Sequence, residues 1–266
     1  MSTFSSPGDV SPFGRIDFIM VRPSHPGNVG AAARAIKTMG FRRLCLVAPR
    51  DHDIIREAEA QALASGATDV LAQASLFSRL SDALAGTTLA FALTARPRDL
   101  GPTICDIRQA ADVGSAHLLT HDGTRVAIVL GTESSGLTNE DIALCQRICH
   151  IPANPQYSSL NVAQALQLAA WEFRYALSSG LNQALMPVTG KQAAPAGNLP
   201  ATNDKVQALM AHWEQALISV DFLDPAHPKK LMPRMRHLFT RSQLSNDEVD
   251  MLRGVCTAMI RTSQRR

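Results

Sequence analysis

Residues 151–173, IPANPQYSSLNVAQALQLAAWEF, join a stiff polar turn directly to an apolar helix. Pro152 and Pro155 fix their own backbone φ angles and so restrict the turn. Ser159 and Asn161 then present a hydroxyl and an amide where the helix begins. Helix capping accounts for one such residue but not for the whole polar series. This turn is therefore a candidate functional segment as well as a helix start.

Short apolar runs alternate with helical stretches on the amino-terminal side of this turn. We expect strands at 15–21, 43–49, 87–94, 125–131 and 147–151, with helices at 28–40, 53–65 and 75–85. Asn28 is a plausible N-cap of the first helix, and Gly40 is a natural end for it. Alternating strands and helices predict an α/β fold with a mostly parallel sheet covered on both faces.

The chain divides by composition into four parts. Residues 1–14 are expected to form a disordered tail, and residues 15–180 the α/β domain. Residues 181–201 are rich in Pro, Gly and Ala and predict a linker. Residues 202–266 return to helical periodicity, and Ser245 with Glu248 has the spacing of a capping box. The carboxyl-terminal part is therefore expected to be a small helical module.

Composition favours a soluble cytoplasmic protein. The 266 residues are 45% hydrophobic, and no run approaches the eighteen or so apolar residues of a membrane span. The first residues lack the basic start and apolar core of a secretory signal. The five cysteines are an odd number without a C-x-x-C pair. We therefore expect Cys145 and Cys149 to be buried free thiols in a reduced compartment. Although His150 follows them, no metal is expected.

Basic residues gather in two segments, although a net charge of +3 is too mild to prove a nucleic-acid partner. Residues 15–50 hold seven Lys or Arg against one acid, and residues 229–241 hold five with no acid. A phosphate backbone would select two such segments. On charge alone, a solvated basic surface explains them equally well.

Two further motifs follow predicted strands. HPGNVGAAAR (25–34) has glycines where a strand leads into a helix, but the spacing is not that of the dinucleotide fingerprint G-x-G-x-x-G. GTESSGL (131–137) places Glu133 between Gly131 and Gly136 at the carboxyl end of a strand, where α/β sheets bind ligands. Each motif is weak when it stands alone.

Taken together and in this order, the motifs resemble those of the SPOUT-class 2'-O-ribose RNA methyltransferases. The matching patterns are N-x-G-x-x-x-R (Asn28, Gly30, Arg34), G-x-E-x-x-G-L (Gly131, Glu133, Gly136, Leu137) and I-P…S-L-N (Ile151, Pro152, Ser159, Leu160, Asn161). The stretches 25–41, 154–167 and 227–241 are similar to those of the TrmJ branch, which methylates the ribose of nucleotide 32 in the tRNA anticodon loop. The resemblance covers about residues 15–266.

This resemblance implies a deep trefoil knot, a homodimer and S-adenosylmethionine (SAM) as methyl donor, without a metal. The residues that it implies for the cofactor site are Thr94, Ala95, Arg96, Gly131, Ile151, Ser158, Ser159 and Leu160. The catalytic group that it implies is Arg34, Asn28, Glu133, Ser159 and Asn161, with Arg34 and the SAM of one site supplied by different subunits. The apolar helix after Asn161 is implied to pack in the dimer interface.

A guanidinium stays protonated at any ordinary pH, so we expect Arg34 to hold a phosphate and stabilise the developing 2'-oxyanion instead of acting as a base. Asn28 and Glu133 would orient that arginine or the ribose. RNA contacts are expected from Arg22, His25, Arg34, Lys229, Lys230, Arg234, Arg236 and Arg241. The alternatives are a methyltransferase for another tRNA position or ribosomal RNA, a non-catalytic RNA-binding protein and, more distantly, a nicotinamide-dependent enzyme.

Overall fold

A computed structural model describes residues 11–96, 102–184 and 199–264 of the chain. In these ranges a seven-stranded sheet has the order β3-β2-β1-β6-β4-β7-β5, and every strand pair is parallel. The strands are β1 Ile16–Val21, β2 Arg43–Val47, β3 Ser75–Phe77, β4 Leu89–Leu93, β5 Thr103–Asp106, β6 Val126–Leu130 and β7 Arg147–His150. The predicted α/β class is confirmed.

The central strands β1, β6 and β4 are buried along their whole length. Both of their faces are covered, so β4 and β6 are continuous apolar runs, and β1 departs from this only at Asp17, which is paired with Arg43 and Arg125. On one face, Phe18, Phe91 and Ile128 pack in the larger core, together with α1, α2, α3, α5 and α7. On the other face, Ile19, Ala92 and other apolar side chains of the sheet pack against α4 and α6.

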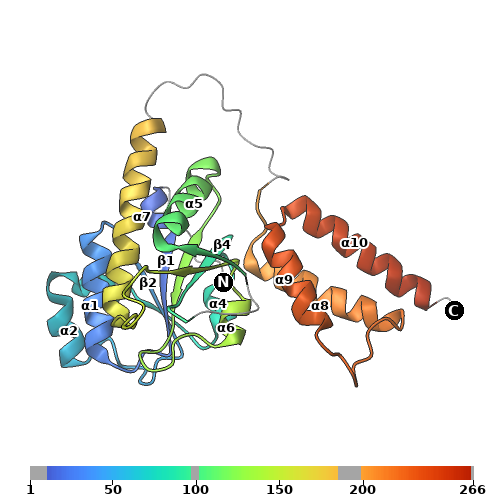
Figure 1. Ribbon diagram of the computed structural model, residues 1–266, viewed down its shortest axis with the longest axis horizontal. Coiled ribbons are helices and arrows are strands. Elements are labelled where there is room, and N and C mark those ends of the chain that lie inside the picture. The colour runs from blue at the N-terminus through green and yellow to red at the C-terminus, as the bar shows by residue number, and fades with distance from the viewer. Residues whose placement is uncertain (1–10, 97–101, 185–198, 265–266) are drawn as a thin grey trace.

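Helices cover the sheet and form the carboxyl-terminal part of the chain (Figure 1). Around the sheet lie the short 3-10 turns Pro12–Arg15 and Ser65–Ala67 with α1 Pro26–Thr38, α2 Ala58–Ala64, α3 Thr68–Ala72, α4 Leu80–Ala83, α5 Ile107–Thr120, α6 Asn139–Ala143 and α7 Val162–Ala184. The carboxyl-terminal helices are α8 Asn203–Ser219, α9 Leu231–Ser242 and α10 Asn246–Ser263.

The start of α1 differs from the prediction. Asn28 is not its N-cap, because the helix begins at Pro26 and His25 occupies the cap position. Proline suits the first turn of a helix, where its missing N–H has no partner to lose. The side chain of Asn28 is thereby free to bond outside the helix. The predicted end at Gly40 is confirmed, since Gly40 has a φ of +78°.

Two edge strands and one helix start were predicted wrongly. Residues 75–77 form β3 instead of the beginning of a helix, and only 80–83 of the expected 75–85 is α-helical. Strand β5 was not predicted at all. The expected helix 53–65 begins only at Ala58, because residues 51–57 form turns. An edge strand buries few side chains, so its sequence carries a weak apolar pattern.

The carboxyl-terminal module has its own apolar core, in which Leu209, Phe239 and Cys256 are buried. The predicted capping box at Ser245 and Glu248 is confirmed. Asn203 joins the module to the sheet domain, because its Nδ2 donates to the carbonyl of Leu144 at 2.8 Å and its backbone N–H to that of Thr87. These carbonyls lie near the amino-terminal ends of β7 and β4. The module therefore docks at the edge of the sheet where the strands begin.

The expected tail and linker lie partly outside the described residues, at 1–10 and 185–198. Where the structure describes them, they are ordered: residues 12–14 of the expected tail belong to the first 3-10 turn, and Gly14 is buried there. Residues 181–184 belong to the end of α7, and Pro200 forms a β-bridge with Ser245.

All five cysteines are free and buried, which confirms the prediction made for Cys145 and Cys149. Burial raises the pKa of the Cys149 thiol well above its ordinary value, and His150 Nδ1 is hydrogen bonded to the Cys105 carbonyl oxygen at 3.0 Å. Among the helices in the described ranges, none has the length and apolar character needed to cross a membrane.

Candidate functional site

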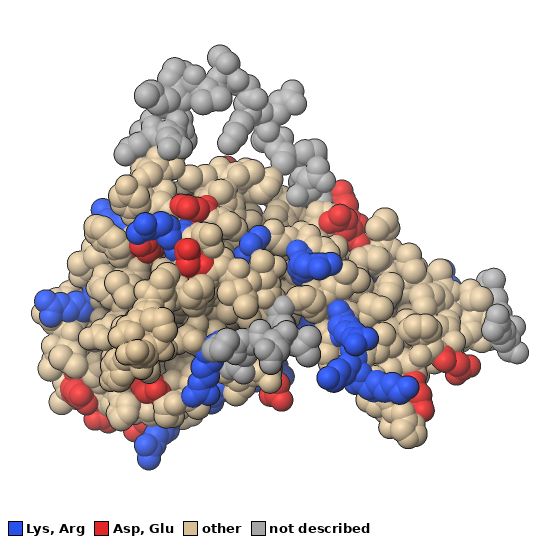
Figure 2. Space-filling model, viewed as in Figure 1, with Lys and Arg blue, Asp and Glu red and all other residues tan. Residues whose placement is uncertain are grey.

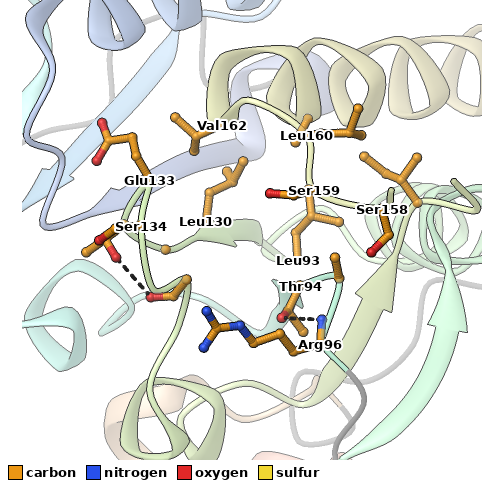
Figure 3. Close-up of a pocket in the computed structure, with 16 residues that line it drawn as sticks. Leu93, Thr94, Arg96, Leu130, Glu133, Ser134, Ser158, Ser159, Leu160 and Val162 are labelled. Atoms are coloured by element: carbon orange, nitrogen blue, oxygen red, sulfur yellow. Dashed lines mark hydrogen bonds between the residues drawn. The ribbon is translucent and has the colours of Figure 1, made fainter. Parts of the chain in front are cut away.

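A pocket lies at the carboxyl ends of β4, β6 and β7, where three neighbouring strands end at one edge of the sheet (Figure 3). The segments that follow these strands form its walls, and the first turn of α7 closes one side. All eight residues that the resemblance implies for a cofactor line it. The full lining is Leu93, Thr94, Ala95, Arg96, Leu130, Gly131, Thr132, Glu133, Ser134, Gly136, Ile151, Ser158, Ser159, Leu160, Val162 and Ala165.

The turn after β6 owes its shape to two glycines. A Cβ on Gly131 would lie 2.0 Å from the carbonyl carbon of Gly136, so no larger residue fits there. Gly136 has a φ of +69°, which glycine adopts without strain. Thr132 and Gly136 exchange backbone hydrogen bonds of 3.3 and 3.0 Å across the turn. The turn is therefore tight, and it fixes where Glu133 projects.

Glu133, Asn28 and Asn161 form a chain of hydrogen bonds beside the pocket. Asn28 Nδ2 donates to Glu133 Oε1 at 3.1 Å, and Asn28 Oδ1 accepts from Asn161 Nδ2 at 2.9 Å. Asn161 Oδ1 also accepts the backbone N–H of Ala163 at 2.9 Å, so this residue caps α7 as well. Polar side chains thus join three segments that are far apart in the sequence. Sequence patterns predicted that these segments lie near one another but not that they are hydrogen bonded.

Ser24 is a member of this group that the sequence analysis missed. Its hydroxyl donates to Glu133 Oε2 at 2.9 Å, and its backbone N–H and that of His25 point to the same carboxylate at 3.3 Å. A short polar residue between β1 and α1 was the only signal available. Burial raises the pKa of Glu133, but the hydrogen bonds from Asn28, Ser24 and His25 outweigh it and hold the pKa below its ordinary value. Glu133 is therefore an ionised acceptor at neutral pH.

Arg34 is placed apart from the pocket. Its side chain is exposed on α1, and in the described part of the chain no hydrogen bond or ion pair joins it to another residue. On the same side of the molecule, α1 and α7 border a groove lined by Ala31, Ala35, Leu160, Asn161, Ala163, Gln164, Gln167 and Leu168. A single chain therefore does not bring Arg34 together with the residues that line the pocket.

Helix α7 serves two surfaces. Leu166, Phe173 and Leu177 are buried in the core of the sheet domain, whereas Leu168, Trp171 and Tyr175 are exposed, at 40%, 53% and 64%. These three positions follow a spacing of three and four residues, so they form one apolar stripe. An exposed stripe of large apolar side chains is typical of a surface that another protein covers.

Several basic residues of the first basic segment have internal partners. Arg15 is buried and donates to the carbonyls of Leu118, His121 and Asp122. Arg43 pairs with the buried Asp17, and Lys37 with Asp69. These contacts explain part of the local positive charge without RNA.

The predicted RNA residues near the pocket have different surroundings. Arg22 pairs with Asp141, with Nη2 to Oδ2 at 2.5 Å. His25 is exposed at the start of α1. Whether they contact RNA stays a prediction.

The second basic segment faces solvent more fully. Lys229, Lys230, Arg234 and Arg241 are exposed, while Arg236 is half-buried and hydrogen bonded to Gln207. Figure 2 shows a group of Lys and Arg side chains gathered on this module, over α9. This helix is therefore the better-exposed basic surface of the two.

The pocket can receive a molecule with both apolar and polar parts. Leu93, Leu130 and Val162 supply an apolar wall, and Thr94, Thr132, Ser134 and Ser158 supply hydroxyls. Figure 3 shows the side chain of Arg96 extending from the segment of Thr94 toward that of Ser134. Within the described residues, the backbone N–H groups of Ser158, Ser159 and Leu160 have no protein partner, so they are available to a ligand.

Comparison with known proteins identifies the family. The SpoU rRNA Methylase family model matches residues 15–171, and the model of the TrmJ tRNA methyltransferase C-terminal domain matches residues 204–266. The tRNA (cytidine/uridine/adenosine-2'-O-)-methyltransferase TrmJ of Pseudomonas aeruginosa is 38% identical over 243 residues, which are 91% of this chain and 93% of the relative.

Two solved structures agree with this. TrmJ from Z. mobilis ZM4 has 32% sequence identity and a TM-score of 0.75, and the match covers 91% of this chain and 98% of the other. A probable methyltransferase from Bordetella pertussis Tohama I has 67% identity and a TM-score of 0.60 over 62% of this chain and 98% of the other. The chain therefore belongs to the SpoU methylase family and, within it, to the TrmJ tRNA 2'-O-methyltransferases.

Proposed function

We propose that this protein transfers the methyl group of SAM to the ribose 2'-hydroxyl of nucleotide 32, a cytidine or uridine, in the tRNA anticodon loop. It does so in the cytoplasm as a homodimer. The observation that carries the proposal is one arrangement: the pocket at the ends of β4, β6 and β7, bordered by the hydrogen-bonded chain Glu133–Asn28–Asn161. Family membership supports the reaction class.

The residues that line the pocket fit SAM. The apolar wall of Leu93, Leu130 and Val162 suits the adenine ring, and the hydroxyls and free backbone N–H groups suit the ribose and the methionine carboxylate. Gly131 and Gly136 lie close together in the pocket wall and carry no side chains that could fill the space for SAM. When bound, SAM supplies an activated methyl on a sulfonium, so the protein's task is alignment and charge stabilisation.

The chain's own residues then have separable roles. Glu133 stays ionised and holds Asn28 and the amino-terminal end of α1 in a fixed place. Asn161 links this carboxylate chain to the turn that presents Ser159. The side chain of Arg34 lies exposed on α1, and a guanidinium there can hold a phosphate and stabilise negative charge on the 2'-oxygen. The proton lost from the 2'-hydroxyl passes to water, so Arg34 does not have to accept it.

We further propose that Arg34 acts on the SAM bound by the partner subunit. Within one chain Arg34 does not line the pocket, and the exposed stripe of Leu168, Trp171 and Tyr175 with the groove beside α1 offers a surface for a second copy. We also propose that the segments 131–136 and 151–161, which meet at the pocket, are part of a trefoil knot.

A mixing experiment tests the shared site. Arg34→Ala and Gly131→Ala should each be inactive alone. After subunit exchange between differently tagged homodimers, each heterodimer should regain one site, about a quarter of wild-type activity in a random mixture. If verified heterodimers remain inactive, Arg34 and the SAM it serves belong to the same subunit.

The RNA contacts are proposed for His25, Arg34, Lys229, Lys230, Arg234, Arg236 and Arg241. Transfer of labelled methyl from SAM to an unmodified tRNA transcript, compared with ribosomal RNA fragments, tests the substrate class. The P. aeruginosa relative is named for cytidine, uridine and adenosine, so transcripts with each base at position 32 belong in the assay. Methylation of ribosomal RNA alone would overturn the tRNA proposal.

A further inference from the structure

One ion pair near the pocket is not explained by any of the motifs. Arg22 directly follows β1, and its guanidinium contacts Asp141, with Nη2 to Oδ2 at 2.5 Å and Nη1 to Oδ1 at 3.4 Å. The side chain of Asp141 is only 9% exposed, while that of Arg22 is 40% exposed. A carboxylate that is so buried is stable as an anion only when charged or polar groups contact it.

Asp141 belongs to the structure that follows the glycine turn. Its carboxylate also accepts the backbone N–H of Thr138 at 2.9 Å, and the Thr138 hydroxyl accepts the backbone N–H of Asp141, which completes a capping box at the start of α6. Leu137 and Ile142 on either side are buried. The position of Asp141 is therefore rigidly tied to the end of segment 131–137, which carries Glu133.

Arg22 is held equally firmly within the segment 22–28, which carries Ser24, His25 and Asn28 of the site. Its backbone N–H donates to the carbonyl of Val47 at 2.7 Å, and its φ of +52° turns the chain sharply toward Ser24. A non-glycine residue pays a conformational penalty for such a φ and persists there only when its surroundings hold it. Two residues later, Ser24 and His25 bind Glu133, and Asn28 follows.

The segments 22–28 and 131–141 are thus joined twice, once by Glu133 inside the site and once by the Arg22–Asp141 pair outside it. We propose that Arg22 is a positioning residue, which holds Glu133 and Asn28 in register through Asp141, and that this replaces the RNA contact expected for it from sequence. This rests on the proposed function, because the register matters only if these side chains align the reacting ribose. The pair acts on alignment and not on RNA affinity.

The test compares Arg22→Gln, Asp141→Asn, the double variant and Arg22→Lys under saturating SAM, with tRNA varied. Arg22→Gln and Asp141→Asn should each lower kcat about tenfold, since small misplacements near reacting groups have effects of this size or larger. The KM for tRNA should stay within about twofold of wild type, because the lost contact is internal. The double variant should be no worse than either single one, and Arg22→Lys should recover part of kcat.

Arg79→Gln is the matched control. Arg79 forms a comparable pair with Asp82, with hydrogen bonds of 3.1 and 3.2 Å, but both side chains are exposed and neither lines the pocket. Its kcat and KM should equal those of the wild type.

Three outcomes would overturn the inference. In the first, Arg22→Gln raises the KM for tRNA without changing kcat, and Asp141→Asn has wild-type kinetics. That result would assign Arg22 to RNA binding. The second is wild-type kinetics in both single variants. The third is a kcat that returns fully to wild type when the assay is cooled far below the melting temperature, which would mean a purely structural role. Absence of methyl transfer by the wild-type protein would instead contradict the proposed function itself.

Discussion

The side chain of Asn28 bonds to Glu133 on one side and to Asn161 on the other, although these residues are 105 and 133 positions away in the sequence. An amide suits this place because it carries one donor and one acceptor group. The ionised Glu133 needs the donor, and Asn161, whose oxygen already caps α7, offers its own donor to the Asn28 oxygen. Both polar atoms of the Asn28 side chain are therefore bonded to site residues.

Replacing this amide should damage catalysis more than folding. Asn28→Ala removes both hydrogen bonds, and we expect kcat to fall about tenfold to a hundredfold with a small change in melting temperature. Steady-state methylation of tRNA and a thermal melt measure the two effects. Asn246→Ala is the control, since Asn246 also uses both amide atoms, toward Lys205 and Leu199, in the carboxyl-terminal module. Equal losses of activity in both variants would contradict a specific role for Asn28.

Gly131 should tolerate no side chain. The Cβ of Gly131→Ala would lie 2.0 Å from the Gly136 carbonyl carbon and 2.3 Å from the Leu137 backbone nitrogen, so the backbone of the turn must move. We expect a large loss of SAM affinity, measured by titration calorimetry. Gly66→Ala is the control, because a Cβ there meets nothing within 4 Å. SAM binding of wild-type strength in Gly131→Ala would show that the turn is not part of the cofactor site.

The basic surface of α9 should set the salt dependence of RNA binding. Replacing the exposed Lys229, Lys230 and Arg234 with Ala should weaken tRNA binding and lower the slope of log affinity against log salt by roughly one per lost phosphate contact. Fluorescence anisotropy with labelled tRNA at several salt concentrations measures both quantities. An unchanged affinity and slope would assign this surface a structural role.

Stability should fall in mild acid because of His117. Burial lowers the pKa of His117 to about 4, with further contributions from His121 and Arg15. A depressed folded pKa means that the stabilisation is complete above the unfolded pKa of 6.5 and is lost as pH falls from there toward 4. Between pH 7 and pH 5 we expect a loss of about 1 to 2 kcal/mol in the free energy of unfolding.

Urea unfolding at the two pH values checks this, with His117→Gln for comparison. The variant should lose less stability on acidification than the wild type, because glutamine does not titrate. Equal losses in the two proteins would place the acid sensitivity elsewhere.

Sequence patterns were sufficient for the central sheet and insufficient at its edges. Strands β1, β2, β4 and β6 are mostly apolar and almost wholly buried, and a run of that kind is visible in one sequence. In the shorter β7, only Ile148 and Cys149 are buried. Strand β3 has two exposed residues out of three, and β5 has two out of four. Their stability comes from pairing with a neighbour, which no local pattern records.

The candidate site divides in the same way. The residues around the pocket could be named because the resemblance to the SPOUT methyltransferases implies them, and strand-end reasoning alone pointed only to the motif 131–137. The contacts of Ser24, Arg22 and Asn28 could not be predicted, because each has a partner more than a hundred residues away. Asn28 even carried a plausible local explanation, as a helix cap, that the start of α1 at Pro26 removed.

The most direct test of the central claim uses the wild-type protein, labelled SAM and two unmodified tRNA transcripts. One transcript is all ribose, and the other has a single 2'-deoxyribose at nucleotide 32. The proposed function predicts methyl incorporation into the first transcript only. Equal incorporation into both would contradict the claim, because the methyl group would then be attached to a different atom or nucleotide.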